Sequence, residues 1–231
     1  MMKISYELKY DLDRDIWNWY YGANYSENGE NNFTDSGDLE TLKKIKGLKT
    51  LEEAEPILRP FLQQKADDPS SELNVFLKTT TKQFEELFDQ ACAMMESITK
   101  RPIANEKFTF YVTTFPRMIV FYDEGIVFLY TRIDNELWGM PMDGFMHELL
   151  HFQTDKYWRQ NQESPVSKLS EDDYFKLKES LTVILDEELK PVITLPDCSY
   201  PEFKDLRDKL HAHWKSNHDF DALVNYGVGL L

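Results

Sequence analysis

The sequence lacks several features that would place it in a broad class of protein. No hydrophobic run approaches the roughly 20 residues of a membrane-spanning helix, and residues 1–15 carry charges where a signal peptide has its apolar core. Basic residues are few: 26 lysines and arginines stand against 41 aspartates and glutamates, for a formal net charge of −15. Because nucleic acids and anionic membrane surfaces repel such a chain, we expect neither as a partner.

Cysteine is almost absent from the sequence. Only Cys92 and Cys198 occur, so the fold cannot depend on a framework of disulfides. Neither cysteine has a second one nearby, which excludes a cysteine-based zinc site. A reducing environment is the expectation for such a chain, and we predict a cytoplasmic protein.

The composition is that of a chain that can bury a core. Hydrophobic residues make up 42 % and aromatic residues 14 % of the 231 positions, enough for one large domain or two small ones. Helical spacing of apolar residues dominates residues 39–98 and returns near residue 142. A polar stretch at residues 65–72 is the best linker. We therefore predict a mainly helical N-terminal segment at 1–66 and a catalytic domain at 67–231, unless the two form one continuous domain.

Segments with the composition of strands are concentrated in the middle of the chain. Residues 108–112, 118–122 and 126–130 are rich in β-branched and aromatic side chains. The last two are separated by Asp123-Glu124-Gly125, which predicts a tight turn and an antiparallel hairpin. With helices on both sides of these strands, we predict an α+β fold. It should be mainly helical, with a small, mostly antiparallel sheet that precedes the helix described next.

The most informative pattern is His147-Glu148-Leu149-Leu150-His151. Two histidines four residues apart lie on one face of an α-helix, about one turn apart, so their ring nitrogens can converge on one metal ion. Glu148 lies beside them and can take a proton from a zinc-bound water, whose pKa the metal lowers to about 7. The flanking residues are apolar, which indicates a helix in the interior with its polar triplet facing a cavity.

A catalytic zinc usually has three protein ligands and one open position. No histidine follows His151 within a few residues, so a carboxylate on a later helix is the leading candidate for the third ligand. Glu179 borders the apolar side of a predicted helix that opens with a capping pattern at Ser170 and ends before Pro191. We predict that His147, His151 and Glu179 bind Zn²⁺.

This set of residues resembles the gluzincin branch of the zincin metallopeptidases over roughly residues 107–190. The resemblance implies a peptidase in which Glu148 assists the attack of zinc-bound water on a peptide bond. It also implies that a sheet edge, such as residues 109–113, aligns an extended peptide. The chain departs from the larger gluzincins in its own spacing to Glu179 and in carrying Val183 where they have an aspartate.

Gluzincins also use carboxylates to orient the histidines, and a tyrosine or histidine to stabilise the oxyanion. Asp143 and Asp155, four residues before His147 and four after His151, are candidates for the first role, although both could equally be solvated helix charges. Tyr200 and His211 are candidates for the second, and a surface position is the alternative for His211.

Two other functions are compatible with the motif. A non-catalytic zinc-binding regulatory or interaction protein on the same scaffold would keep the metal ligands, but it would not need Glu148. A deformylase-like hydrolase would take an upstream cysteine as its third ligand, and Cys92 lies within a predicted helix instead of a strand. A zinc peptidase acting on peptides or proteins is therefore the preferred interpretation. The sequence does not indicate an oligomeric state.

Overall fold

The computed structural model describes residues 4–24, 38–131, 141–194 and 200–231, so Cys198 lies outside the described residues. The described residues form two compact units. The sheet unit comprises residues 5–82 and 107–131, and the helical unit comprises residue 4, residues 83–106 and the described residues from 141 onward. The boundary between residues 82 and 83 falls within one helix, α4 (Glu72–Thr99). The division into 1–66 and 67–231 stays a prediction.

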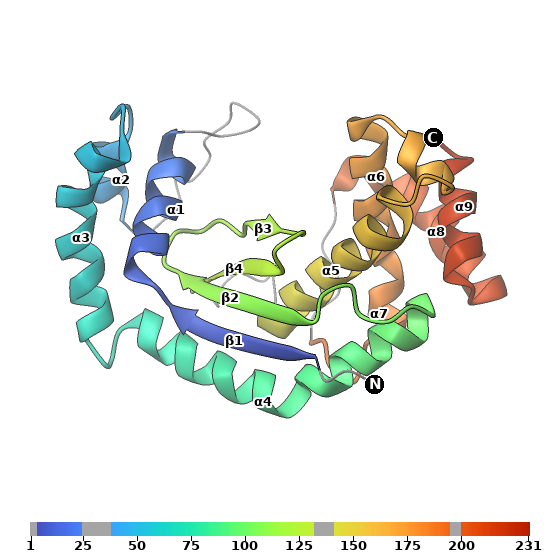
Figure 1. Ribbon diagram of the computed structural model, residues 1–231, viewed down its shortest axis with the longest axis horizontal. Helices are drawn as coiled ribbons and strands as arrows, with labels where there is room; N and C mark the ends of the chain where they lie inside the picture. Colours follow the sequence, from blue (N-terminus) through green and yellow to red (C-terminus); the bar gives the residue numbers. More distant parts are fainter. Residues whose placement is uncertain (1–3, 25–37, 132–140, 195–199) are drawn as a thin grey trace. The chain divides into compact units, whose positions relative to one another are not determined.

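The sheet unit contains a sheet with the strand order β1-β2-β4-β3 (Figure 1). Its strands are β1 (Ser5–Tyr10), β2 (Lys107–Thr113), β3 (Val120–Phe121) and β4 (Ile126–Tyr130). β1 runs parallel to β2, and β2 runs parallel to β4. Only β3 and β4 pair antiparallel. The predicted hairpin is therefore confirmed, whereas the prediction of a mostly antiparallel sheet is wrong.

The parallel pairing has its cause in the long connection that precedes β2. A parallel neighbour needs a crossover connection, and the helical residues between β1 and β2 supply it. On the other side of β2, the strand β4 is buried at three consecutive positions, as is usual for a strand of a parallel sheet that is covered on both faces. The hairpin turn that leads into β4 is made at Gly125, whose φ of 66° suits a residue without a side chain.

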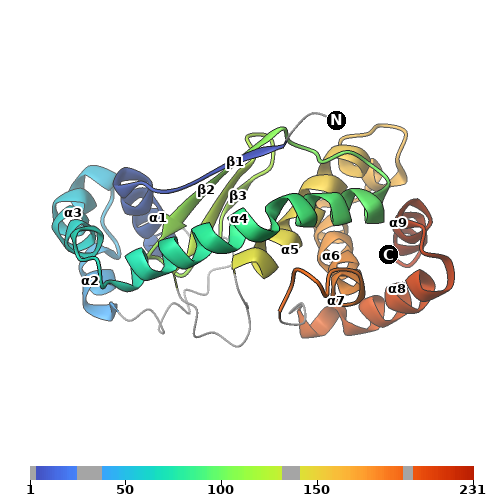
Figure 2. The ribbon, with the colours of Figure 1, turned by 90° about the horizontal axis from the view of Figure 1, so that it is seen from below.

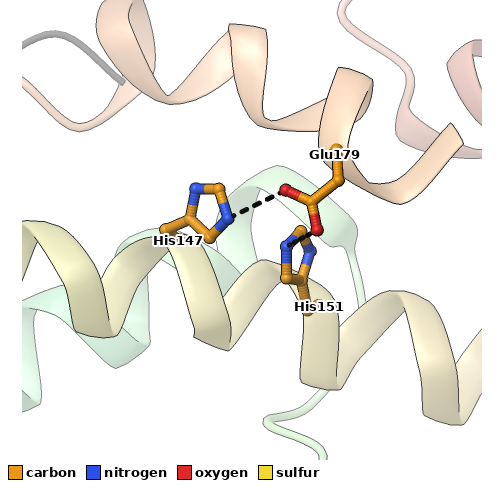
Figure 3. Close-up of side chains that lie close together, drawn as sticks. All are labelled: His147, His151 and Glu179. Carbon is orange, nitrogen blue, oxygen red and sulfur yellow. Dashed lines mark ion pairs between the residues drawn. The ribbon is translucent and has the colours of Figure 1, made fainter. Parts of the chain in front are cut away.

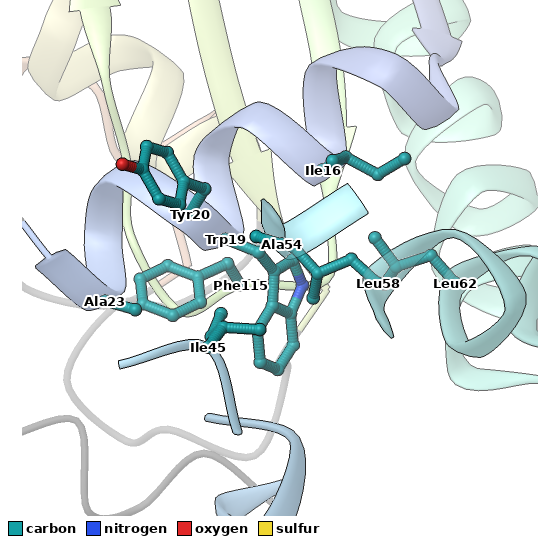
Figure 4. Packing of buried hydrophobic residues seen from close by; sticks show 9 residues of the cluster. All are labelled: Ile16, Trp19, Tyr20, Ala23, Ile45, Ala54, Leu58, Leu62 and Phe115. Atoms are coloured by element: carbon teal, nitrogen blue, oxygen red, sulfur yellow. The ribbon is translucent and has the colours of Figure 1, made fainter. Parts of the chain in front are cut away.

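Three helices of the sheet unit share a hydrophobic cluster (Figure 4). They are α1 (Leu12–Asn24), α2 (Leu39–Ile45) and α3 (Leu51–Asp67). The ring of Trp19 on α1 lies 5.1 Å from that of Phe115 and 5.5 Å from that of Phe61, in edge-on arrangements. A Cβ atom at Gly22 would lie 2.1 Å from Cε1 of Phe115, so α1 can approach this ring only because residue 22 is glycine.

A buried carboxylate fastens α1 to the end of β2. Asp15, which is 1 % exposed, accepts hydrogen bonds from Oγ1 of Thr113 (2.5 Å) and from both N (3.0 Å) and Oγ1 (2.8 Å) of Thr114. Burial raises the pKa of Asp15 to about 6, against the opposing effect of these hydrogen bonds. The folded protein therefore buries a carboxyl group whose pKa lies within about one unit of neutral pH.

The helical unit is built from the C-terminal part of α4 and from later helices. These are α5 (Pro141–Thr154), α6 (Glu171–Leu181), α7 (Leu185–Glu188), α8 (Lys204–Asn217) and α9 (Phe220–Val228). α4 packs on α5 through Phe145, whose ring centroid lies 5.7 Å from that of Phe84 and 5.5 Å from that of Phe88. α8 and α9 lie side by side (Figure 2). A mainly helical α+β fold is thus confirmed.

The start of α6 agrees with the capping pattern in the sequence. Oγ of Ser170 accepts a hydrogen bond from the backbone N–H of Asp173 at 3.1 Å. α5 continues into a π-helical turn at Asp155–Arg159, a feature that is frequent near functional sites. Within the described part of the chain, no helix combines the length and the apolar character that a membrane span requires.

Candidate metal centre

Helix α5 presents the His-Glu-x-x-His motif from a buried position. The side chain of His151 is 1 % exposed and that of His147 is 12 % exposed. Their ring centroids are 4.5 Å apart, with the ring planes at 77°. The apolar residues around the motif are fully buried: Phe145, Met146, Leu149, Leu150 and Phe152. The predicted interior helix with a polar triplet is therefore present.

Helix α6 brings Glu179 to the two histidines (Figure 3). Oε2 of Glu179 lies 3.3 Å from Nε2 of His147, and Oε1 lies 3.3 Å from Nε2 of His151. Potential ligand atoms of all three residues fall within 4.8 Å of one another. The three residues predicted as ligands from the sequence are therefore positioned to hold a metal ion.

The carboxylate of Glu179 bridges the two imidazoles, with one oxygen directed to each histidine. One potential ligand atom from each of the three residues lies within 4.8 Å of the others, which is close enough for a single ion to be held between them. In addition, Nδ1 of the buried His151 has no hydrogen-bond partner among the described residues, and Nε2 has only the 3.3 Å contact with Oε1 of Glu179. Buried polar atoms rarely lack a partner, and a coordinated ion would supply it.

The electrostatics of the cluster favour the protonation states that a metal needs. Burial and the neighbouring His147 lower the pKa of His151, which keeps its imidazole neutral and able to coordinate. Burial acts to raise the pKa of Glu179, but the ring nitrogens of His147 and His151, each 3.3 Å from one of its oxygens, outweigh it and hold that pKa well below its usual range. Neutral imidazoles and an ionised carboxylate are the ligand forms that bind divalent metals.

Glu148 lies on α5 directly after the first histidine. Its Oε2 atom is buried and, among the residues that the structure describes, has no hydrogen-bond partner. A buried carboxylate oxygen in this state is able to accept a proton from a molecule bound beside it. The catalytic role predicted for Glu148 from the sequence stays a prediction.

Two cationic side chains contact Glu179, and neither of them was predicted from the sequence. Nη1 of Arg207, a residue that is 7 % exposed, donates to the carbonyl oxygen of Glu179 at 2.9 Å and to Oγ1 of Thr182 at 2.7 Å. Nζ of Lys178 lies 3.4 Å from Oε1 of Glu179. The sequence contains one sign that Arg207 is buried: it lies three residues before Leu210 and therefore on the same buried face of α8.

The two aspartates predicted to orient the histidines have hydrogen bonds to other groups. Asp143 accepts from the backbone N–H (2.8 Å) and from Oγ1 (2.7 Å) of Thr194. Asp155 accepts from Nε2 of Gln160 at 2.7 Å and from the hydroxyl of Tyr174 at 3.4 Å. These contacts fasten neighbouring segments to the ends of α5. A role of either aspartate in orienting the histidines stays a prediction.

The two candidates for oxyanion stabilisation occupy different surroundings. Burial and the negative charges of Glu179, Glu202 and Glu148 raise the pKa of Tyr200, so its phenol lies within electrostatic reach of the motif. His211 has its Nε2 atom 3.3 Å from Oε1 of Glu187, which is on α7. Both roles remain predictions.

Comparison with known proteins yields no match to a family model, to a curated protein or to a solved structure. The assignment of the site therefore depends on its geometry and its chemistry.

Proposed function

We propose that the chain is a zinc-dependent hydrolase that cleaves peptide bonds. The observation that carries the proposal is the buried convergence of His147, His151 and Glu179 beside the carboxylate of Glu148. Two histidines and one glutamate are a donor set of catalytic zinc sites, which keep a fourth position for water or substrate. A structural zinc would have that position filled by a fourth protein ligand.

Glu148 carries the proton transfer in this proposal. When bound, zinc would polarise the scissile carbonyl and lower the pKa of a water molecule. Glu148 takes a proton from the attacking water and delivers it to the nitrogen of the leaving amine. The C–N bond breaks, and the products are a carboxylate and an amine. The buried and partnerless Oε2 of Glu148 supports this role, because no competing hydrogen bond from a described residue holds it.

Tyr200 is the residue that we assign to the oxyanion. Burial and the carboxylates of Glu179 and Glu148 raise the pKa of Tyr200, which puts its phenol near the motif, and a phenol can donate a hydrogen bond to the negative oxygen that develops during attack. The resemblance of the His-Glu-x-x-His helix and the later glutamate to gluzincins supports a peptide as the substrate. The prediction that a peptide aligns along residues 109–113 is wrong, because β2 is paired with β1 on one side and with β4 on the other and has no free edge.

The decisive experiment measures metal content and hydrolysis on the same samples. Wild-type protein and Glu148→Gln should each hold about one zinc per chain, while Glu148→Gln should lose hydrolysis of a peptide library by at least about 100-fold. Glu163→Gln, which removes an exposed carboxylate of the helical unit, is the matched control and should keep both properties.

Two results would count against the proposal. A chain that neither retains nor takes up zinc would remove its basis. Full zinc occupancy without cleavage of any peptide or protein would instead favour the non-catalytic zinc-binding alternative.

A further inference from the structure

A lysine lies against the proposed metal ligands. Nζ of Lys178 is 3.4 Å from Oε1 of Glu179, and the lysine side chain is 16 % exposed. Its positive charge also reaches His151. A cation in this position repels a divalent metal ion and so works against metal binding. Metal affinity therefore does not explain a lysine here, in a chain whose formal charge is −15.

Exposed aromatic side chains adjoin this lysine. Phe175, one helical turn before Glu179 on α6, is 38 % exposed, and Tyr200 is 44 % exposed. Their ring centroids are 5.4 Å apart, and both rings contact Phe203, at 5.9 Å and 5.3 Å respectively. We call Phe175, Tyr200 and Phe203 the aromatic ledge. Nζ of Lys178 lies 5.5 Å from the ring centroid of Phe175, so the ledge and the cation form one surface.

We propose that Lys178 and the aromatic ledge bind the C-terminal residue of a peptide substrate, which makes the proposed peptidase a carboxypeptidase. The ammonium group of Lys178 pairs with the α-carboxylate, and the ledge packs against a large apolar side chain of the same residue. This inference rests on the proposed function, because it assigns the substrate of the same site.

The dimensions of a peptide support this assignment. The carbon of a scissile carbonyl and the carboxylate carbon of the next residue are three bonds apart, or about 3–4 Å. An ion held by Oε1 of Glu179 at roughly 2.0–2.2 Å lies no more than about 5.6 Å from Nζ of Lys178. A terminal carboxylate is therefore within reach of Lys178 when the scissile carbonyl is at the metal. An internal residue of a longer chain carries no such charge.

The aromatic ledge supports the assignment of a large apolar side chain to the C-terminal residue of the substrate. A side chain branches from the same Cα as the terminal carboxylate, so a residue held by Lys178 places its side chain beside Phe175. Exposed aromatic surface next to a site with polar groups is typical of ligand recognition. In the reaction, water adds OH to the scissile carbonyl carbon, the C–N bond breaks, and the remaining proton goes to nitrogen. The released product is one free amino acid.

Binding can be measured without turnover in zinc-loaded Glu148→Gln protein. The probes are a pentapeptide ending in phenylalanine with a free carboxylate and the same peptide with an amidated end. We expect calorimetry to give at least about tenfold tighter binding of the free acid, in the range of one charge-assisted pair. Lys178→Met in this background should abolish the difference, and Lys178→Arg should retain it. Zinc content is measured for each variant, to separate recognition of the carboxylate from loss of metal.

Matched controls exist for both parts of the surface. Lys176→Met removes a lysine of the same helix that is 47 % exposed, and it should leave the preference for the free acid intact. Phe175→Ala should weaken the binding of the peptide that ends in phenylalanine but not the binding of a peptide that ends in alanine. Tyr226→Ala removes another exposed aromatic ring, stacked on His213, and should change neither affinity.

Equal affinity for acid and amide, or a preference that survives Lys178→Met, overturns this inference, as does binding of neither peptide. The outcomes also separate it from the proposed function. If the wild-type protein cleaves free and amidated peptides at equal rates, the proposed peptidase activity stands and the recognition of the terminal carboxylate fails. If the protein binds the free acid selectively but cleaves no peptide, recognition of the carboxylate stands and the proposed hydrolysis fails. A chain that holds no zinc in any form overturns both.

Discussion

Arg207 holds the backbone of Glu179: its guanidinium donates to the carbonyl oxygen of Glu179 at 2.9 Å, and the same nitrogen reaches Oγ1 of Thr182 at 2.7 Å. Carbonyl groups in the last turn of a helix have no partner within that helix. Glu179 lies in the last turn of α6, and its carbonyl oxygen accepts from the buried arginine of α8 and from Oγ1 of Thr182, at 2.7 Å, while its carboxylate faces the histidines.

Replacement of this arginine should therefore affect stability and metal binding together. Arg207→Met removes one of two donors to the carbonyl oxygen of Glu179, which also accepts from Oγ1 of Thr182 at 2.7 Å, and it removes the donor to the Thr182 hydroxyl. We expect this loss to cost about 1–3 kcal/mol in unfolding free energy. It should also weaken zinc binding, because the end of α6 is no longer fixed. Urea unfolding and zinc competition with a chelator measure the two effects. Lys209→Met, an exposed change on the same helix, is the control. Unchanged stability and zinc affinity in Arg207→Met would contradict this role.

Zinc should stabilise the folded chain through the triad. A ligand that binds only the native state adds about 2.7 kcal/mol of stability at a free concentration of 100 times its dissociation constant. We expect the thermal midpoint of the wild-type protein to rise on zinc addition and to fall again with a chelator. His151→Ala should lose this response, whereas His213→Ala, which removes a histidine stacked on Tyr226, should retain it. A zinc response that persists in His151→Ala would place the metal elsewhere.

The buried Asp15 should make the stability of the sheet unit depend on pH. Its pKa of about 6 in the folded chain lies above its ordinary value of 3.8, so the folded state holds the proton more tightly. The resulting stabilisation is fully present below the unfolded pKa and is lost as the pH rises through 6. The two pKa values correspond to a loss of about 2 kcal/mol between pH 4 and pH 7.

Asp15→Asn should remove this loss from the pH profile of the unfolding free energy, whatever its effect on the absolute stability. Asp13→Asn, an exposed change two residues earlier, should leave the profile as it is in the wild-type protein. Chemical denaturation at several pH values measures the slope. An equal slope in wild-type and Asp15→Asn proteins would show that another group titrates.

The contact between α1 and Phe115 gives a prediction of steric strain. A Cβ atom at Gly22 would lie 2.1 Å from Cε1 of Phe115, so Gly22→Ala forces the ring or the helix to move. Overpacking of this kind costs about 1–3 kcal/mol, which exceeds the gain of up to about 1 kcal/mol from replacing a helical glycine. Urea denaturation should therefore show a less stable protein.

Gly229→Ala is the comparison, because its nearest neighbour would be the carbonyl oxygen of Tyr226 at 3.4 Å. We expect only a small change in stability there. A stabilised Gly22→Ala would mean that the cluster around Phe115 rearranges readily.

The parts of the site that the sequence predicts are those fixed by local geometry. His147, Glu148 and His151 belong to one helix, and helical periodicity alone sets their relative positions. Glu179 was recognised because a charged residue stood at the apolar border of a second helix. Lys178 and Arg207 were missed, because their roles depend on side-chain directions and on the packing of α6 against α8.

The same distinction applies to the fold. The turn at Asp123-Glu124-Gly125 is a local signal, and it correctly predicted the antiparallel pairing of β3 and β4. The extension of that pairing to the whole sheet failed, because the partners of β2 are chosen by long-range contacts. No local pattern records that Ser5 will lie opposite Lys107.

The long sequence separation between the paired strands β1 and β2 also affects the nascent chain during synthesis. β1 leaves the ribosome first, but its only neighbour in the described sheet, β2, follows about a hundred residues later, or after about 5–20 s of translation. Until then, the nascent chain carries a strand with unpaired backbone groups, which is exposed to aggregation and to capture by chaperones. A ribosome-bound chain that ends after α4 should therefore remain sensitive to protease near residue 10, and protection should appear only when residues 107–113 have emerged.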